Sequence, residues 1–281
     1  MNSIPVALIQ LCATSNVAAN LAISERLARE AASAGARVIL LPEAYAFIGP
    51  HAGKVDILEE IPPMPGGSAP ILHRFCRIAR ETGTEIVLGG HHERAPDPQK
   101  CYNTCVHIGE DGEVRACYRK IHLFDVALDD GTELKESTHT LPGDRVVVTE
   151  TAFGALGLSI CYDLRFPYLY QALVDGGAMA ICVPSAFTAS TGAAHWHTLL
   201  RARAIESQCY ILAPAQHGAH NGNRTSYGHS LVVDPWGEVI AELSGGDGVL
   251  LADIEPERVA AVRRQLPSLR HRVLLPSENA V

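Results

Sequence analysis

The sequence lacks a long apolar run, a paired-cysteine motif and an excess of basic residues, and each absence excludes a class of protein. No apolar stretch reaches the ~20 residues of a membrane-spanning helix, so we expect no membrane association. The net charge of −8 argues against a surface that binds nucleic acid or anionic lipid. Because residues 1–5 lack the basic region of a signal peptide, we expect a cytoplasmic protein.

Eight cysteines are present, but no two of them form a Cys-x-x-Cys pair. In a reducing compartment such scattered cysteines are mostly small core residues with free thiols. A metal site is the other interpretation of many cysteines and histidines. Neither His91-His92 nor His195-Trp196-His197 has a matching set of further ligands, so we expect no metal.

What is present is a core-forming composition in which strand and helix patterns alternate. Hydrophobic residues make up 47% and charged residues 19% of the 281 residues, which is enough for a substantial core. Strands are predicted over residues 6–12, 37–41, 84–90, 104–108, 114–118, 145–151, 156–161, 179–183, 210–214, 230–233 and 238–242, and helices over 16–34, 68–83, 167–175, 194–208 and 255–265. No linker interrupts this order. It predicts one α/β domain over residues 1–281, with a mixed sheet or two packed sheets.

Four residues with useful chemistry lie at strand ends or in the long polar stretch 120–144. Glu43 and Cys161 each end a buried strand, Lys120 ends another, and Glu136 lies within the polar stretch. Sites in α/β sheets collect at the carboxyl ends of strands. A helix predicted just after Cys161 favours its thiolate form. Taken singly, each residue also fits a solvated or core position.

Three motifs in register resemble the signature motifs of the nitrilase superfamily of carbon–nitrogen hydrolases. They are residues 41–43, which contain Glu43, residues 118–125, which begin Tyr-Arg-Lys, and residues 161–167, which begin Cys-Tyr-Asp. The likeness runs from residue 6 to about residue 272. It implies a four-layer αββα sandwich that dimerises into an αββα–αββα block.

The resemblance also implies a role for each residue. Cys161 is the nucleophile that forms a thioester, and Glu43 is the general base. Lys120 and the backbone N–H of Tyr162 stabilise the oxyanion, a donor of this kind being worth roughly 3 kcal/mol. Glu136 orients Lys120 or the substrate nitrogen. Because these residues supply the nucleophile, the base and the oxyanion donors, no metal or organic cofactor is implied.

Residues 184–187, 191–196, 200–206 and 226–230 are similar to the branch that contains deaminated glutathione amidase and ω-amidase. Both enzymes act on a 2-oxoglutaryl amide, and they differ in the leaving group, which is cysteinylglycine or ammonia. Residues 201–210 and 225–237 are more similar to the former. We therefore predict hydrolysis of deaminated glutathione to 2-oxoglutarate and cysteinylglycine.

The resemblance suggests which side chains bind the substrate carboxylate. Those that match are Arg165, Phe187 and Thr191, with Tyr45 and Phe124 as further candidates for the pocket wall. An arginine suits the task because its planar guanidinium pairs bidentately with a carboxylate. Arg165 could instead form a structural ion pair, and Phe187 could be a core residue.

Several alternatives stay open at this point. ω-Amidase, nitrile hydrolase or N-carbamoyl hydrolase activity would use the same motifs. A papain-like cysteine–histidine pair is a competitor, since His122, His139, His195 and His197 are available. The chain could also be a catalytically silent binding module on this fold. The expected partners are a small carboxylate-bearing amide and further copies of the chain, as a homodimer or higher oligomer.

Overall fold

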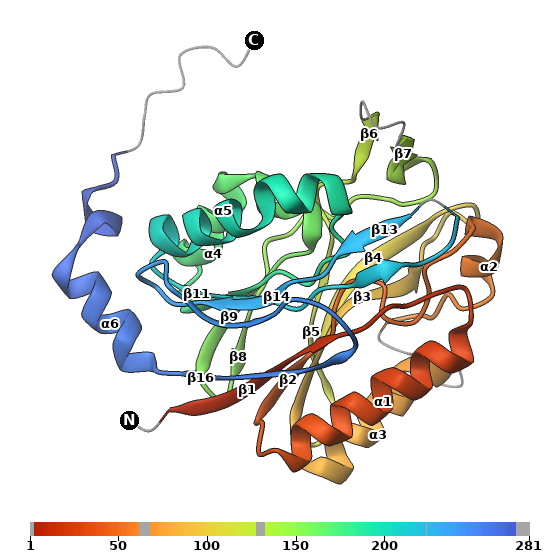
Figure 1. Cartoon of the computed structure of the whole chain (residues 1–281), viewed down its shortest axis with the longest axis horizontal. Coiled ribbons are helices and arrows are strands. Elements are labelled where there is room, and N and C mark those ends of the chain that lie inside the picture. Colours follow the sequence, from red (N-terminus) through yellow and green to blue (C-terminus); the bar gives the residue numbers. More distant parts are fainter. Residues whose placement is uncertain (1–2, 62–67, 128–132, 223, 274–281) are drawn as a thin grey trace.

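The architecture is a sandwich of two six-stranded sheets with helices on both outer faces (Figure 1). The computed structural model describes residues 3–61, 68–127, 133–222 and 224–273. In the first sheet the order is β16-β1-β2-β3-β4-β5, and in the second it is β15-β14-β11-β10-β9-β8. The expected αββα layering is confirmed.

Apart from β16, the strands of the first sheet come from the N-terminal half of the chain and those of the second sheet from the C-terminal half. The first sheet contains β1 (Ile4–Gln10), β2 (Val38–Leu40), β3 (Glu85–Arg94), β4 (Cys101–Ile108), β5 (Val114–Arg119) and β16 (Gly248–Ile254), with α1 (Val17–Ser33) and α3 (Pro70–Thr82) outside it. The second contains β8 (Val148–Thr151), β9 (Gly154–Leu158), β10 (Ala180–Cys182), β11 (Tyr210–Ala213), β14 (Ser230–Val233) and β15 (Val239–Leu243), covered by α4 (Pro167–Asp175) and α5 (Ala189–Ser207).

The remaining elements lie between the strands of the two sheets or follow the last strand. They are α2 (His51–Val55), the pair β6 (Asp125–Ala127) and β7 (Glu133–Lys135), the pair β12 (His217–Ala219) and β13 (Thr225–Tyr227), α6 (Pro256–Gln265), and 3₁₀ turns at Glu136–Thr138, Cys161–Arg165 and Ser268–His271. The stretch 120–144 is therefore only partly irregular. It carries β6, β7 and a 3₁₀ turn.

Alternation of side chains along the central strands builds two hydrophobic cores. In β1, Val6 and Leu8 belong to the core that includes the second sheet, whereas Ala7 and Ile9 belong to the core under α1 and α3. Successive strand residues point to opposite faces, so a strand covered on both faces must be apolar throughout. This explains why β1 and β2 appear as continuous apolar runs.

Helix ends follow the sequence signals, and the differences have local causes. The Asn16 side chain accepts from Ala19 N at 3.1 Å and begins α1, and Gly83 ends α3 with φ +63. The helix predicted from residue 194 begins at Ala189 instead. Its first turn has the composition of a loop, but Gly192 N donates to Thr188 O at 2.8 Å and extends the helix.

Two strands of the first sheet run further than predicted. β3 continues to Arg94 because a bulge between Gly89 and His91 restores its pairing with β4, which begins at Cys101 rather than 104. Conversely, β9 ends at Leu158, three residues before Cys161. The nucleophile candidate therefore follows the strand rather than ending it.

The described helices do not include one that is long and apolar enough to cross a membrane. All eight cysteines are described and free. Cys105 and Cys182 face each other across the two sheets with their sulfur atoms 4.0 Å apart, about twice the ~2.05 Å of a disulfide bond.

Candidate active site

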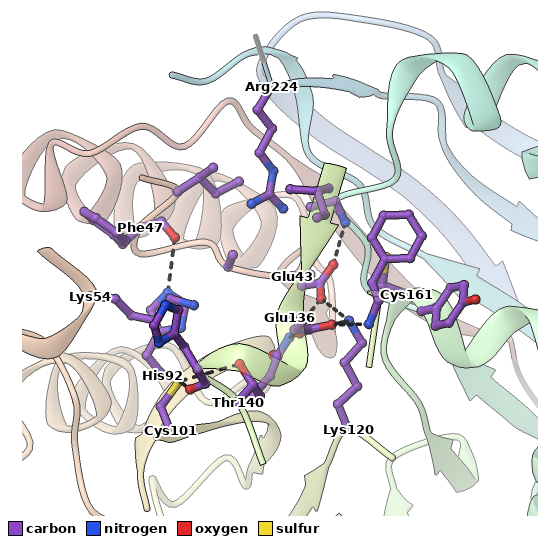
Figure 2. A pocket seen from close by; sticks show the side chains of 18 of the residues that line it. Glu43, Phe47, Lys54, His92, Cys101, Lys120, Glu136, Thr140, Cys161 and Arg224 are labelled. Atoms are coloured by element: carbon purple, nitrogen blue, oxygen red, sulfur yellow. Dashed lines mark hydrogen bonds and ion pairs between the residues drawn. The ribbon is translucent and has the colours of Figure 1, made fainter. Parts of the chain in front are cut away.

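Glu43, Lys120, Glu136 and Cys161 meet in one cavity of about 210 Å³. Glu43 follows β2, Lys120 follows β5, Glu136 opens the turn after β7, and Cys161 lies beyond β9. The first two come from one sheet and Cys161 from the other. Figure 2 shows the four side chains directed toward a common point. The structure thus brings together the four residues singled out in the sequence.

The Lys120 ammonium lies between two carboxylates. Its Nζ is 3.0 Å from Glu43 Oε1 and 2.8 Å from Glu136 Oε2. Only 2% of the Lys120 side chain is exposed. Burial alone would lower the pKa of Lys120, but Glu136 and Glu43 raise it well above its ordinary value. Lys120 is therefore a permanent cation at neutral pH.

The Glu43 carboxylate is held by donors on both oxygens. Besides Lys120, Asn103 Nδ2 donates to Oε1 at 2.9 Å and Ala186 N to Oε2 at 2.9 Å. Burial raises the pKa of Glu43, but the Lys120 charge and the hydrogen bonds from Cys161, Lys120 and the Ala186 N–H outweigh it, so the pKa lies below its ordinary value. Glu43 is consequently ionised and able to accept a proton.

Asn103 was not singled out in the sequence, although it ties the two carboxylates together. Its Nδ2 also lies 3.3 Å from Glu136 Oε1. The Glu136 carboxylate accepts from Phe124 N at 2.8 Å as well. Glu136 thus holds both Lys120 and the loop that carries Phe124 in position. Nothing in the sequence distinguished Asn103 from the other polar residues of the strands.

Cys161 occupies a strained turn. Its φ is +48, in the left-handed region that non-glycine residues seldom adopt. Its N–H donates to Pro184 O at 3.0 Å. Tyr162 follows in the first turn of a 3₁₀ helix, where backbone N–H groups have no carbonyl partner within the helix. A substrate oxygen beside the sulfur can use that donor.

The turn that favours a thiolate at Cys161 is opposed by burial and by a neighbouring negative charge. Burial raises the pKa of the Cys161 thiol, and the neighbouring Glu43 carboxylate raises it further, whereas Lys120 lowers it. Because burial and the Glu43 charge outweigh Lys120 and the Ala186 N–H, the pKa of the thiol lies above its ordinary value and the thiol is neutral at pH 7. The sulfur becomes an anion only when its proton passes to a base, and Glu43 is adjacent.

A buried aspartate joins the second and third motifs. Asp163 is fully buried and accepts from Tyr118 Oη at 2.7 Å, from His122 N at 3.1 Å and from Ile160 N at 2.9 Å. The Asp163 side chain therefore links the end of the strand before Lys120 to the turn that carries Cys161. The sequence shows these residues inside the motifs but not that they contact each other.

Two glycines allow the strand ends to approach closely. A Cβ on Gly89 would lie 2.1 Å from Pro184 Cβ and 2.2 Å from Leu41 O. A Cβ on Gly90 would lie 3.0 Å from both Asn103 Oδ1 and Glu43 Cα. The Gly89-Gly90 pair thus leaves room for Pro184 on one side and for Glu43 and Asn103 on the other, which the sequence pattern of an ordinary strand did not indicate.

Three of the five residues expected to contact the substrate line the cavity, namely Phe124, Phe187 and Thr191. Tyr45 does not. It is fully buried, its hydroxyl shares a 2.8 Å hydrogen bond with His91 Nδ1, and its ring packs on Phe75 at 5.2 Å. Tyr45 therefore belongs to the core under α3.

Arg165 does not line the cavity either. Its guanidinium lies over the Phe187 ring at 5.2 Å and 3.4 Å from His195 Nδ1. The alternative of an Arg165–Asp163 ion pair is not what forms, because Asp163 bonds to Tyr118, Ile160 and His122.

The papain-like alternative fails on geometry. His122 Nδ1 pairs with Asp163, His195 lies beside Arg165, and His197 bonds to Glu242. His139 lines the cavity but stacks on the His51 ring at 3.7 Å. Within the described chain, none of these histidines hydrogen-bonds to Cys161.

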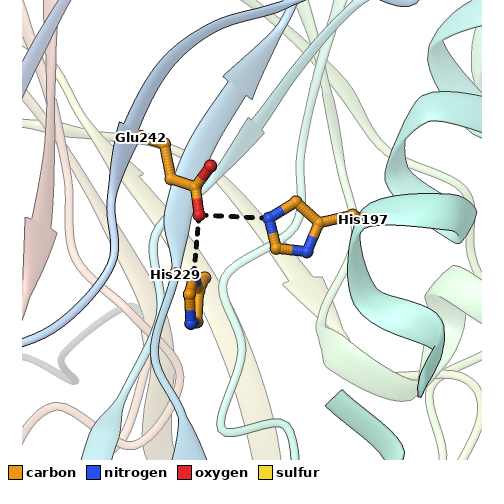
Figure 3. A group of neighbouring side chains, drawn as sticks. All are labelled: His197, His229 and Glu242. Carbon is orange, nitrogen blue, oxygen red and sulfur yellow. Dashed lines mark hydrogen bonds and ion pairs between the residues drawn. The ribbon is translucent and has the colours of Figure 1, made fainter. Parts of the chain in front are cut away.

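One cluster of metal-ligand type occurs in the described residues, and sequence spacing missed it. His197 of α5, His229 and Glu242 of β15 converge in Figure 3. Glu242 Oε1 lies 3.1 Å from His197 Nε2 and 2.6 Å from His229 Nδ1. One carboxylate oxygen satisfies both imidazoles, so the cluster is a hydrogen-bond network that ties α5 to the second sheet.

This sandwich, with a thiol, two carboxylates and an ammonium gathered in one cavity, defines a hydrolase of the nitrilase type. The chain belongs to the carbon–nitrogen hydrolase family, whose model matches residues 5–264. It is 45% identical over 271 residues to deaminated glutathione amidase of Bos taurus, covering 95% of this chain and 81% of that protein. The protein of that name from Synechocystis sp. is 40% identical over 273 residues, with coverages of 96% and 98%. Among solved structures, Saccharomyces cerevisiae Nit3, a member of branch 10 of the nitrilase superfamily, superposes with a TM-score of 0.82 at 31% identity and covers 94% of each chain.

Proposed function

We propose that the chain hydrolyses a linear amide through a thioester on Cys161. The observation that carries this proposal is the convergence of that thiol with the Glu43 carboxylate and the Lys120 ammonium in one cavity. A neutral thiol beside an ionised carboxylate is ready for proton transfer at the moment of attack.

The geometry suggests an order of events. Glu43 takes the thiol proton as the sulfur attacks the carbonyl carbon, and Lys120 with the Tyr162 N–H stabilises the oxyanion. The protonated Glu43 then donates to the leaving nitrogen, which departs as the thioester forms. Glu43 next takes a proton from water, whose oxygen attacks the thioester. As the C–S bond breaks and the acid is released, Glu43 returns that proton to the sulfur, which restores the thiol. Glu136 holds Lys120 in place throughout.

For the substrate we propose deaminated glutathione, which is cleaved to 2-oxoglutarate and cysteinylglycine. The names of the bovine and Synechocystis relatives support this choice. Phe187, Thr191 and Phe124 provide a wall for the acyl chain next to Cys161. The Arg165 guanidinium, which lies over the Phe187 ring at 5.2 Å, would supply the positive charge for the acyl carboxylate.

A side-by-side assay tests this function. We expect a higher kcat/KM for deaminated glutathione than for 2-oxoglutaramate, and mass spectrometry of a quenched reaction should find a 2-oxoglutaryl adduct on Cys161. A ratio in favour of 2-oxoglutaramate would assign the chain as an ω-amidase instead. Absence of any adduct or turnover with either amide would support a silent binding module.

We also propose that the chain acts as one domain, as a cytoplasmic homodimer. The family resemblance suggests the dimer, and exposed apolar residues on the outer side of the second sheet support it. Ile205 of α5 is 48% exposed and Trp236 43% exposed, and Ile205 packs against the turn that contains Trp236 through Gly237. Light scattering should give a mass of twice 30.1 kDa.

A further inference from the structure

The cavity has a second cationic edge that the proposed chemistry does not use. Its acidic lining residues, Glu43 and Glu136, are both bound to Lys120. The remaining charged residues of the lining, Lys54, Lys135 and Arg224, are all basic. In a chain with net charge −8 and lysines only at positions 54, 100, 120 and 135, this gathering of cations indicates an anionic ligand.

Two of these cations have no carboxylate partner within the described residues. Lys135 lies 3.1 Å from Glu133 at the surface, but no ion pair forms at Lys54 or at Arg224 in that part of the chain. Lys54 is in the last turn of α2, and Arg224 just precedes β13. In Figure 2, Lys54 and Cys161 lie on opposite sides of Glu43. The Arg224 guanidinium is directed into the cavity.

A polar group without a partner lies on the same edge. His51 Nδ1 is buried and has no hydrogen-bond partner among the residues that the structure describes, and its ring stacks on His139 at 3.7 Å. Burial lowers the pKa of His51, with further lowering by His139 and Lys54, so the ring is neutral and can accept or donate one hydrogen bond. This edge therefore fits a polar ligand that also carries negative charge.

We propose that Lys54 and Arg224 bind the terminal carboxylate of the leaving peptide, with His51 bonding to a peptide group beside it. This inference rests on the proposed function. A dipeptide reaches about 7 Å beyond the scissile nitrogen, so its carboxylate falls at the outer edge of the cavity rather than at Glu43. Ammonia has no carboxylate that could reach this edge. The subsite therefore selects a carboxylate-bearing peptide leaving group over ammonia.

The test uses three substrates and two single variants, Lys54→Gln and Arg224→Gln, with their combination. The substrates are deaminated glutathione, its analogue with a terminal carboxamide, and 2-oxoglutaramate. We expect each variant to lower kcat/KM for deaminated glutathione by roughly tenfold or more, through a higher KM. Activity on the other two should be unchanged. Arg26→Gln, on the exposed face of α1, is the matched control.

Each other outcome has a defined meaning. Equal losses on all three substrates would overturn the subsite, because the cations would then act on the acyl half or on the fold. Unchanged activity on deaminated glutathione would also overturn it. A wild-type preference for 2-oxoglutaramate would instead refute the proposed function. The subsite would then stand only if cysteinylglycine inhibited the wild type more strongly than the double variant.

Discussion

Removing the Lys120 charge should destabilise the protein in a way that depends on pH. In Lys120→Met the Glu43 and Glu136 carboxylates lose the ammonium that lies 3.0 and 2.8 Å away. Glu43 is 5% exposed, so water replaces little of what is lost. Leaving one partner of a buried ion pair uncompensated typically costs about 3 to 5 kcal/mol. In a chain of this size that corresponds to a fall in Tm of roughly 10 °C.

The pH dependence has a definite sign. In the wild type the pKa of Glu43 lies below its ordinary value, because the Lys120 charge and hydrogen bonds outweigh burial. Without Lys120, burial and the Glu136 charge raise the pKa of Glu43 above its unfolded value. A group whose pKa is raised on folding stabilises at low pH and loses that contribution as pH rises. The deficit of Lys120→Met should therefore be larger at pH 7 than at pH 5.

Urea denaturation at the two pH values measures this deficit. Lys135→Met is the control, because its ion pair with Glu133 is exposed and should contribute less than about 1 kcal/mol. A double-mutant cycle with Glu136→Gln should show that the combined loss is smaller than the sum of the single losses. An equal deficit at both pH values, or an additive cycle, would refute the picture of a carboxylate pair neutralised by Lys120.

Further predictions concern the nucleophile, the pH profile and the Gly89-Gly90 pair. Cys161→Ala should abolish turnover without lowering Tm, and residual activity near the wild-type level would remove its assigned role. Because the pKa of Glu43 is lowered and burial raises that of Cys161, kcat/KM should stay flat from about pH 6 to about pH 9. A limb within that range would mean that another group controls proton transfer. Gly90→Ala should lower kcat much more than Gly177→Ala, since both positions have positive φ but only Gly90 faces Glu43 and Asn103. Equal losses in the two glycine variants would point to backbone strain alone.

The layers and the reactive residues were accessible from the sequence because each leaves a local trace. Apolar runs such as 38–41 indicate burial on both faces of a strand, and the signals at Asn16 and Gly83 act within one turn of helix. The motif resemblance then supplied Glu43, Lys120 and Cys161. Contacts between residues of the two sheets leave no such local pattern in the sequence. Asn103 resembles any polar residue of a strand.

Errors in the prediction arose where tertiary surroundings override a local rule. The turn after β9 favours a thiolate at Cys161, but burial and the facing Glu43 carboxylate raise the pKa of the thiol and keep it neutral. Tyr45 follows the Glu43 motif and looked exposed to the pocket, but the chain reverses at Ala44, where φ is +56. That reversal sends Tyr45 into the core under α3.

The strained residues explain how two sheets can present one reaction centre. Cys161 and Ala44 both have left-handed backbone conformations, each at a cost of about 1 to 2 kcal/mol. The Cys161 turn is held by Pro184 O and by Asp163, which bonds to Tyr118 of the other sheet. Strain of this kind persists only where surrounding contacts over-determine it. Packing between the sheets, made possible by Gly89 beneath Pro184, is therefore what places the thiol against the carboxylate.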